Sequence, residues 1–331
     1  MAVTMADITK LRKLTGAGMM DCKNALTQAD NNIEKAIEII REKGQAIAAK
    51  RSDRETSNGC VLGKAENGFG AIIALKCETD FVAANADFVK LTQDILDAAV
   101  ANKCKTLDEV KALPMENATV QDAVIARSGI TGEKTELDGY CFIEGDNISV
   151  YDHMGKHMLC TMVQTNKAAE EEAHAIAMQV AAMNPVALDE TSVPQEVKDN
   201  EMKVAIQKTK EEQVEKAVQA ALKKAGFNLY ISENEEHLAE GIAKGNITEA
   251  DAEEIRNIKK TTAEQKAANL PEQMIQNIAN GRMAKFFKEY TLLEQKYEGG
   301  GEEAGKITVK ELLAKKQYTC VALKRVTLNQ E

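Results

Sequence analysis

Apolar residues in the first 45 positions recur every three or four residues, which is the spacing of helices with one buried face. Polar residues that can cap a helix precede two of the predicted helices, and Gly44 is typical of a helix end. The glycines of TGAGMM predict a tight turn before another helix, which begins near Met19. The pattern therefore predicts a three-helix bundle over residues 1–45.

Residues 46–59 are polar and lose the apolar periodicity, which predicts a linker. Beyond it the apolar residues alternate, and CVLGK and FGAIIALKC flank AENG. This arrangement predicts a hairpin in which Gly68 has a positive φ angle. Helices are predicted next at about 80–102 and 107–127. We assign residues 60–133 to a first subdomain of an α+β core.

Residues 134–193 repeat the order of strands followed by a helix. The segments YCFIEG, ISVYDH and HMLCTMVQT alternate, and a helix is predicted at about 168–183, before Pro185. Because strands followed by a helix occur twice, the sequence predicts a core of two related α+β subdomains with antiparallel sheets.

Residues 194–290 are rich in Lys, Glu, Ala and Gln and carry two separate helical stripes of apolar residues. These stripes predict two antiparallel helices that form a coiled-coil arm, with residues 227–268 as its inserted tip. Residues 291–331, which contain TVKELLAKK and YTCVALKRV, are predicted to return to the second core subdomain. The predicted fold class is α+β with a helical arm.

Charge and composition narrow the class of function. The chain has 331 residues and a formal net charge of -10, which gives no electrostatic reason to expect DNA or another nucleic acid as partner. It has no run of about 18 apolar residues and no signal-peptide core, so we expect a cytoplasmic protein without membrane contact. GxGxxG and GxxxxGK[ST] are absent, so we expect no direct nucleotide binding and no cofactor.

Nothing in the sequence indicates covalent catalysis. The seven cysteines include no CxxC pair, which indicates neither a disulfide framework nor a metal site. Cys77 precedes a predicted helix and could be an activated thiol, but strand alternation favours a packed side chain. The four histidines match no ligand or triad spacing. We therefore expect no catalytic residue and a protein that is not an enzyme.

Two short stretches suggest contact with a partner. Met19 and Met20 point about 100° apart on a helix, so only one of them can face the bundle core. An exposed methionine beside a glycine turn is a suitable surface for an apolar partner, and the pattern leaves this role open.

The second stretch is CETDFVAAN, residues 77–85. Thr79 or Asp80 can cap the helix that begins here. Phe81 has helical spacing with Phe88, which favours a core position, although the same spacing allows Phe81 to project beyond the edge of the core.

Four segments together resemble one protein family. LRKLTGAGMMDCKNAL (residues 11–26) and ETDFVAAN (78–85) resemble the two signature segments of bacterial elongation factor Ts. IAMQVAAMNP (176–185) is similar to a helix of that family's core, and GRMAKFFKE (281–289) to the returning helix of its arm. The resemblance implies a UBA-like bundle, a two-subdomain core and a coiled-coil arm.

The resemblance also implies a function, guanine-nucleotide exchange on elongation factor Tu in protein biosynthesis. In that family the segment matching Thr79, Asp80, Phe81 and Val82 enters the G-domain of elongation factor Tu, dislodges Mg²⁺ and promotes GDP release. The implied contacts of the bundle with this G-domain are Leu11, Met19 and Met20.

Two departures from the family pattern affect the remaining implied contacts. Ser128 and Gly129 match an Ile-Gly turn, with serine in place of isoleucine, and Gln179 stands where relatives often carry histidine. The resemblance leaves open a dimer of heterodimers with elongation factor Tu. On the residues alone, a ubiquitin-fold scaffold module that uses the GAGMM turn and a cysteine-dependent enzyme that uses Cys77 remain as alternatives.

Overall fold

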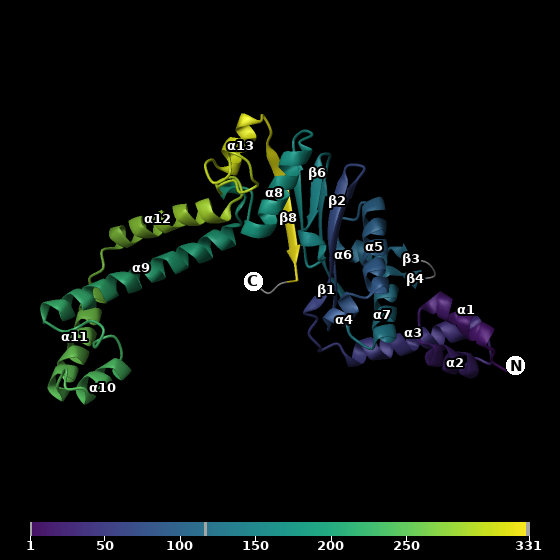
Figure 1. Cartoon of the computed structure of the whole chain (residues 1–331), viewed down its shortest axis with the longest axis horizontal. Coiled ribbons are helices and arrows are strands. Elements are labelled where there is room, and N and C mark those ends of the chain that lie inside the picture. Colours follow the sequence, from purple (N-terminus) through teal and green to yellow (C-terminus); the bar gives the residue numbers. More distant parts are fainter. Residues whose placement is uncertain (1, 116–117, 329–331) are drawn as a thin grey trace. The chain divides into compact units, whose positions relative to one another are not determined.

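The structure is a computed structural model that describes residues 2–115 and 118–328. The described chain divides into two compact units, Met1–Leu188 with Leu292–Glu331, and Asp189–Thr291. The first unit contains the N-terminal bundle and the β-sheets, and the second contains the arm helices (Figure 1). The combination of helices with antiparallel sheets confirms the predicted α+β class.

The predicted N-terminal bundle is confirmed, and its helices enclose a small apolar core. The first helix begins at a capping box, because the Thr4 side chain accepts from the Asp7 N–H while the Asp7 carboxylate accepts from the Thr4 N–H. It ends at Gly16, whose φ is 68°. The bundle helices are α1 (Met5–Thr15), α2 (Met19–Gln28) and α3 (Ile33–Lys50).

The first sheet has the antiparallel strand order β1-β2-β5. Asn67 and Gly68 both have positive φ at the turn between β1 and β2, which confirms the predicted hairpin. The subdomain boundary predicted at residue 134 is wrong, because the strand that follows it pairs along β2. The strands are β1 (Asn58–Glu66), β2 (Phe69–Cys77) and β5 (Thr135–Glu144).

Helices pack on one face of this sheet and are shorter than predicted. The helix expected over 80–102 is divided in two, because the Asn85 side chain accepts from the Asp87 N–H and starts a new helix. The helix expected over 107–127 is interrupted at Pro114, which pairs with Thr119 in two short antiparallel strands. The elements are α4 (Asp80–Ala83), α5 (Ala86–Ala101), α6 (Leu107–Ala112), β3 (Pro114–Met115), β4 (Ala118–Thr119) and α7 (Val120–Thr131).

A second antiparallel sheet has the order β6-β7-β8 and faces the first. Val61 and Ile72 of the first sheet share a buried cluster with Cys160 and Met162 of the second. Helices α8 and α13 cover the other face of the second sheet. The elements are β6 (Ile148–Asp152), β7 (Leu159–Thr165), α8 (Glu170–Met183), α13 (Val309–Lys315) and β8 (Cys320–Thr327), with a 3-10 turn at His153–Gly155.

A close contact between α3 and α7 joins the bundle to the core. The prediction that α3 ends at Gly44 is wrong, since the helix continues to Lys50 and the predicted linker 46–59 shortens to residues 51–57. A Cβ on Gly129 of α7 would lie 2.6 Å from the Gly44 Cα. Both glycines therefore serve the close approach of two helices.

The second unit, Asp189–Thr291, includes all of the region predicted as an arm, residues 194–290. Helices α9 and α12 lie side by side, linked by an ion pair of 2.7 Å between Arg282 and Glu212 (Figure 1). The inserted tip has its own apolar cluster, which includes Leu238 and Ile255. The helices are α9 (Gln195–Lys224), α10 (Glu235–Ala243), α11 (Glu249–Ala268) and α12 (Glu272–Tyr290), with a 3-10 turn at Glu190–Ser192.

Over the described ranges 2–115 and 118–328, every helix is too short or too polar to cross a bilayer.

Candidate functional site

The segment of residues 78–83, here called the Phe81 turn, exposes a large aromatic side chain. Phe81 is 85% exposed, whereas Phe88, one helix further on, is fully buried in the core of the first sheet. The core position that periodicity favoured for Phe81 is therefore wrong. That interpretation required one continuous helix through both residues, and the new helix start at Asn85 breaks the continuity. Val82 packs against the same core from its edge.

Thr79 caps this turn and is itself held by a second residue. Its side-chain oxygen accepts from the Val82 N–H at 3.4 Å, so Thr79 and not Asp80 is the cap. The Thr79 N–H and hydroxyl donate to the carboxylate of Glu133, at 3.1 Å and 2.7 Å. Asp80 is exposed in the first turn of α4, next to Phe81.

Glu78 anchors the stem of the same turn. One guanidinium nitrogen of Arg51 donates to both carboxylate oxygens at 2.9 Å, and the Lys134 N–H donates to one of them at 2.6 Å. Burial alone would raise the pKa of Glu78, but the hydrogen bonds from Lys134 and Arg51 outweigh it and lower the pKa. Asn58 donates from its side chain to the Glu78 carbonyl at 3.0 Å.

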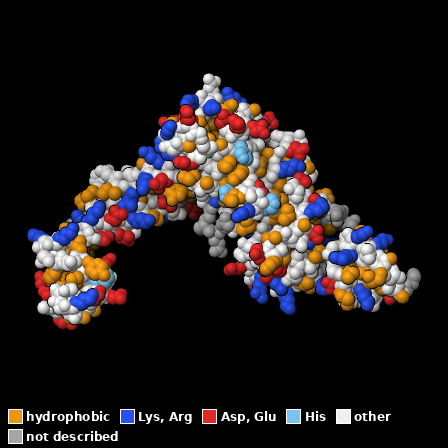
Figure 2. Space-filling model, in the orientation of Figure 1, with side chains coloured by type: hydrophobic (Ala, Val, Ile, Leu, Met, Phe, Trp, Pro, Cys, Tyr) orange, Lys and Arg blue, Asp and Glu red, His pale blue; other side chains and the backbone are white. Residues whose placement is uncertain are grey.

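The methionine turn, residues 16–20, is a second exposed apolar feature in the same unit. Met19 is 53% exposed and Met20 is 65% exposed, so the prediction that one of them is buried is wrong. The reason is that α2 begins at Met19, and its buried face starts one turn later at Cys22. Gly18 precedes α2, and no described side chain caps the helix there. Hydrophobic side chains are visible on the surface of the bundle (Figure 2).

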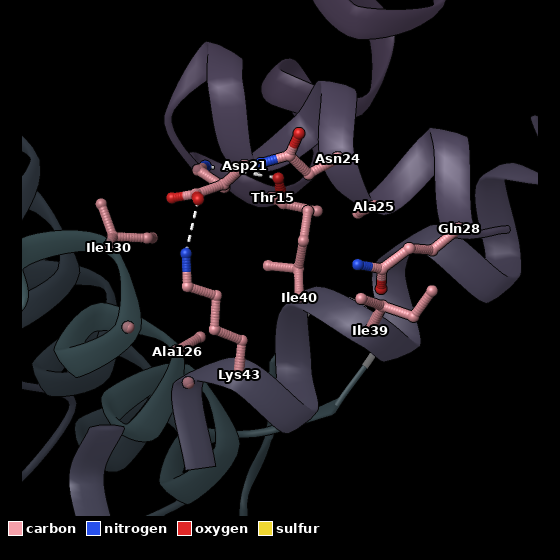
Figure 3. Close-up of a pocket in the computed structure, with 13 residues that line it drawn as sticks. Thr15, Asp21, Asn24, Ala25, Gln28, Ile39, Ile40, Lys43, Ala126 and Ile130 are labelled. Atoms are coloured by element: carbon pink, nitrogen blue, oxygen red, sulfur yellow. Dashed lines mark hydrogen bonds and ion pairs between the residues drawn. The ribbon is translucent and has the colours of Figure 1, made fainter. Parts of the chain in front are cut away.

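A hollow of about 360 Å³ lies beside the methionine turn, between the bundle and α7. Lys43 of α3 extends across it to pair with Asp21 of α2, while Ile130 and Ala126 of α7 form the opposite wall (Figure 3). Both side chains of the ion pair are partly exposed. Among the described ion pairs, this one joins α2 to α3, and its Asp21 directly follows Met20 in the chain.

Three further residues suggested by the resemblance lie inside the molecule. Leu11 is fully buried in the bundle core. Ser128 is also buried, and its hydroxyl oxygen accepts from the Thr135 N–H at 2.9 Å. Gly129 faces Gly44 across the contact of α3 with α7. Packing within the chain already uses each of these residues, and their role as partner contacts stays a prediction.

Gln179 is likewise committed to contacts within the chain. It is buried on α8, its amide nitrogen donates to the Lys296 carbonyl at 2.9 Å, and its oxygen accepts from the Glu298 N–H at 2.9 Å. A direct contact of Gln179 with a partner stays a prediction, since the structure shows only its contacts within the chain. The residue fixes the segment after the arm onto the core helix.

Glu133 and Arg51 were missed by the sequence reasoning. Arg51 lies in the segment interpreted as a linker, and Glu133 is 54 positions away from the threonine that it holds. No local spacing relates either residue to Phe81. The pairing of β2 with β5 sets Thr135 opposite Cys77 and so brings Glu133 close to Thr79. The pairing of β1 with β2 sets Asn58 opposite Cys77 and brings the segment that contains Arg51 close to Glu78.

The thiol nearest the Phe81 turn is unsuited to nucleophilic chemistry. Cys77 is buried, and its Sγ donates to the Thr79 carbonyl at 3.2 Å. Burial raises the pKa of Cys77 to about 12, which disfavours the thiolate at neutral pH. The packed position favoured by the strand alternation is thereby confirmed.

Comparison with known proteins identifies the chain. The family model described as Elongation factor TS matches residues 78–253 and 239–330. Proteins named Elongation factor Ts from Bacteroides fragilis, Phocaeicola vulgatus and Parabacteroides distasonis are 63%, 62% and 62% identical to it, each over 100% of both chains. These matches place the chain among the elongation factors of translation. Within that class it belongs to the elongation factor Ts family, as its signature segments predicted.

Proposed function

We propose that the chain is a guanine-nucleotide exchange factor that binds elongation factor Tu·GDP, dislodges Mg²⁺ and promotes GDP release in the cytoplasm. It acts by binding alone and is not an enzyme. The observation that carries the proposal is the exposure of Phe81 on a turn that is anchored on both sides of its stem. A side chain of this size in water is suited to burial in another protein.

The energetics require more than one contact. Bound nucleotide is held largely by Mg²⁺ and by backbone and lysine contacts to phosphate, so removing the ion removes the largest local charge. To weaken the binding of nucleotide about ten-thousandfold, the exchange factor must bind the nucleotide-free state about 5.5 kcal/mol more tightly than the nucleotide-bound state. Burying one phenylalanine contributes about 1.5–3 kcal/mol. The remainder has to come from other surfaces, and the methionine turn is another exposed apolar surface of this unit.

GDP and the exchange factor must also weaken each other's binding to elongation factor Tu equally. If the exchange factor weakens GDP binding by some factor, GDP weakens binding of the exchange factor by the same factor. The Phe81 turn therefore has to leave when nucleotide returns, which suits a contact made by exposed side chains on a preformed turn.

Stopped-flow release of fluorescent GDP from the cognate elongation factor Tu tests the proposal. Phe81→Ala should slow catalysed release by about 10- to 100-fold, because about 1.4 kcal/mol corresponds to a factor of ten. Asp80→Ala should also slow it. Val321→Ala removes an apolar side chain that is 52% exposed on β8 and serves as the control, with wild-type rates expected.

Two results would contradict the proposal. Wild-type release rates with both Phe81→Ala and Asp80→Ala would show that this turn is not the wedge. A titration that detects no complex with elongation factor Tu would favour the alternative of a scaffold module that uses the methionine turn. Light scattering of the same mixture distinguishes a one-to-one complex from a dimer of heterodimers.

A further inference from the structure

We propose that Glu133 is a positioning residue for the Phe81 turn, holding α4 in the orientation in which Phe81 meets the partner. The inference rests on the proposed function for its kinetic consequence. Its structural consequence, a turn ordered before any partner binds, can be tested on the free protein.

The contact consists of two hydrogen bonds to separate carboxylate oxygens. Oε2 of Glu133 accepts from the Thr79 N–H at 3.1 Å, and Oε1 accepts from the Thr79 hydroxyl at 2.7 Å. Hydrogen bonds to an ionised carboxylate are about twice as strong as neutral ones. Glu133 is itself fixed, since α7 ends at Gly132 with a φ of 72° and the Glu133 N–H donates to the Thr131 hydroxyl at 3.3 Å.

The next residue of the same loop completes a reciprocal arrangement. The Lys134 N–H donates to the Glu78 carboxylate at 2.6 Å, while the Glu133 carboxylate accepts from Thr79. Glu133 and Lys134, which follow α7, thus bind Thr79 and Glu78, which precede α4. Because each pair of residues supplies one donor and one acceptor, the two contacts fix the rotation of the stem as well as its position.

The turn needs such support because its own packing is limited to one side. Helix α4 has four residues and forms barely one turn, and a helix this short is not stable alone. Val82 and Ala83 pack against the edge of the core, whereas Phe81 is 85% exposed and adds almost no packing. Without Glu133 the turn would have to be ordered during binding, and fixing a segment in its bound conformation beforehand removes that entropic cost.

The first test measures amide hydrogen exchange in the free protein by NMR. Glu133→Ala should speed exchange at the Val82 and Ala83 amides, which bond to the Thr79 hydroxyl and carbonyl, by about tenfold or more. Glu133→Gln keeps one acceptor oxygen for the Thr79 N–H and places an amide donor beside the Thr79 hydroxyl, so it should retain more protection than Glu133→Ala. Asp138→Ala removes a carboxylate of β5 that pairs with Lys76 and should leave these amides unchanged.

Thr79→Val is a second variant that keeps the volume of the side chain and removes only the hydroxyl. It should speed exchange at Ala83, whose amide bonds to the Thr79 carbonyl and not to the hydroxyl, in the same direction as Glu133→Ala. Wild-type exchange in both variants would overturn the proposal, because the turn would then be ordered without the carboxylate.

The second test is a double-mutant cycle on GDP release. In the wild-type background Glu133→Ala should slow release by about tenfold, and in the Phe81→Ala background its effect should be much smaller, with only Asp80 left to misplace. An equal effect in both backgrounds would overturn the proposal, since Glu133 would then act independently of Phe81. Glu133→Gln should release GDP faster than Glu133→Ala, because it keeps one of the two acceptor oxygens.

The two tests separate this inference from the proposed function. If the wild-type chain releases no GDP from elongation factor Tu, the proposed function fails, and the amide exchange still decides whether Glu133 orders the turn. If release is normal and Glu133→Ala leaves both exchange and rate unchanged, the positioning role alone fails.

Discussion

The Phe81 turn and the methionine turn both present large apolar side chains from the first turn of a helix, yet the structure supports them differently. The Phe81 turn has a threonine cap, and partly buried carboxylates hold its stem. The methionine turn begins at a glycine without a side-chain cap in the described chain, and its neighbouring ion pair is partly exposed to solvent.

The difference suits two kinds of contact. A rigid aromatic ring on a fixed stem can enter one defined cleft at low entropic cost. Methionine side chains are flexible and polarisable, so Met19 and Met20 can adapt to an uneven apolar surface without a fixed stem. The turn that is fixed in advance is therefore the one that carries the single rigid side chain, Phe81.

The joint between α3 and α7 supports both turns, and breaking it should have the largest effect. Gly129→Ala places a Cβ 2.6 Å from the Gly44 Cα, where backbone has to move. Overpacking of this kind costs about 1–3 kcal/mol. We expect that loss in the free energy of unfolding, measured with denaturant and circular dichroism.

Gly281→Ala is the matched control for this prediction. Gly281 lies within α12, and no described neighbouring atom lies within 4 Å of its added Cβ. Alanine there should stabilise the helix by up to about 1 kcal/mol. A Gly129→Ala protein as stable as wild type would show that the joint is loose and that the two turns are not held in one frame.

Acid should weaken the Phe81 turn through Glu78. Its pKa in the folded chain is below the ordinary value of 4.5, so the contribution of Glu78 to stability is complete above about pH 4.5. That contribution is lost as the pH falls through the lowered pKa, because the folded chain then has to protonate a carboxylate that Arg51 and Lys134 stabilise.

Denaturant unfolding of wild type and Glu78→Gln across this range is the measurement. The wild type should be the more stable protein at pH 7, and the difference should shrink as the pH falls below 4.5. A difference that stays constant down to pH 3 would mean that the carboxylate charge does not anchor the stem.

The sequence predicted elements better than it predicted the site. The hairpin at Asn67 and Gly68 and the buried Phe88 follow from local spacing, and the structure confirms both. A glycine such as Gly44 is typical both of a helix end and of a close contact between two helices. The sequence does not show that α7 packs against this position, so it cannot distinguish the two. Local sequence cannot distinguish two such uses of one residue type.

The orientation of Phe81 shows the same limit in the site. Its periodicity with Phe88 is genuine, but the Asn85 cap interrupts the helix between them. The residue that holds the turn, Glu133, is 54 positions from Thr79 and becomes a neighbour only through the pairing of β2 with β5. The family resemblance located the exposed residue, whereas its supporting contacts required the three-dimensional structure.

The smallest effect is expected at the anchor of the methionine turn. Lys43→Gln removes the ion pair with Asp21, whose side chains are 51% and 37% exposed, and exposed pairs contribute about 0–1 kcal/mol. Unfolding free energy should change by less than about 1 kcal/mol, and GDP release should stay within about twofold of wild type. The adaptable methionines can still reach the partner when α2 shifts slightly. If Lys43→Gln slows release as strongly as Glu133→Ala, the methionine turn depends on a fixed position too, and the distinction between a rigid and an adaptable contact fails.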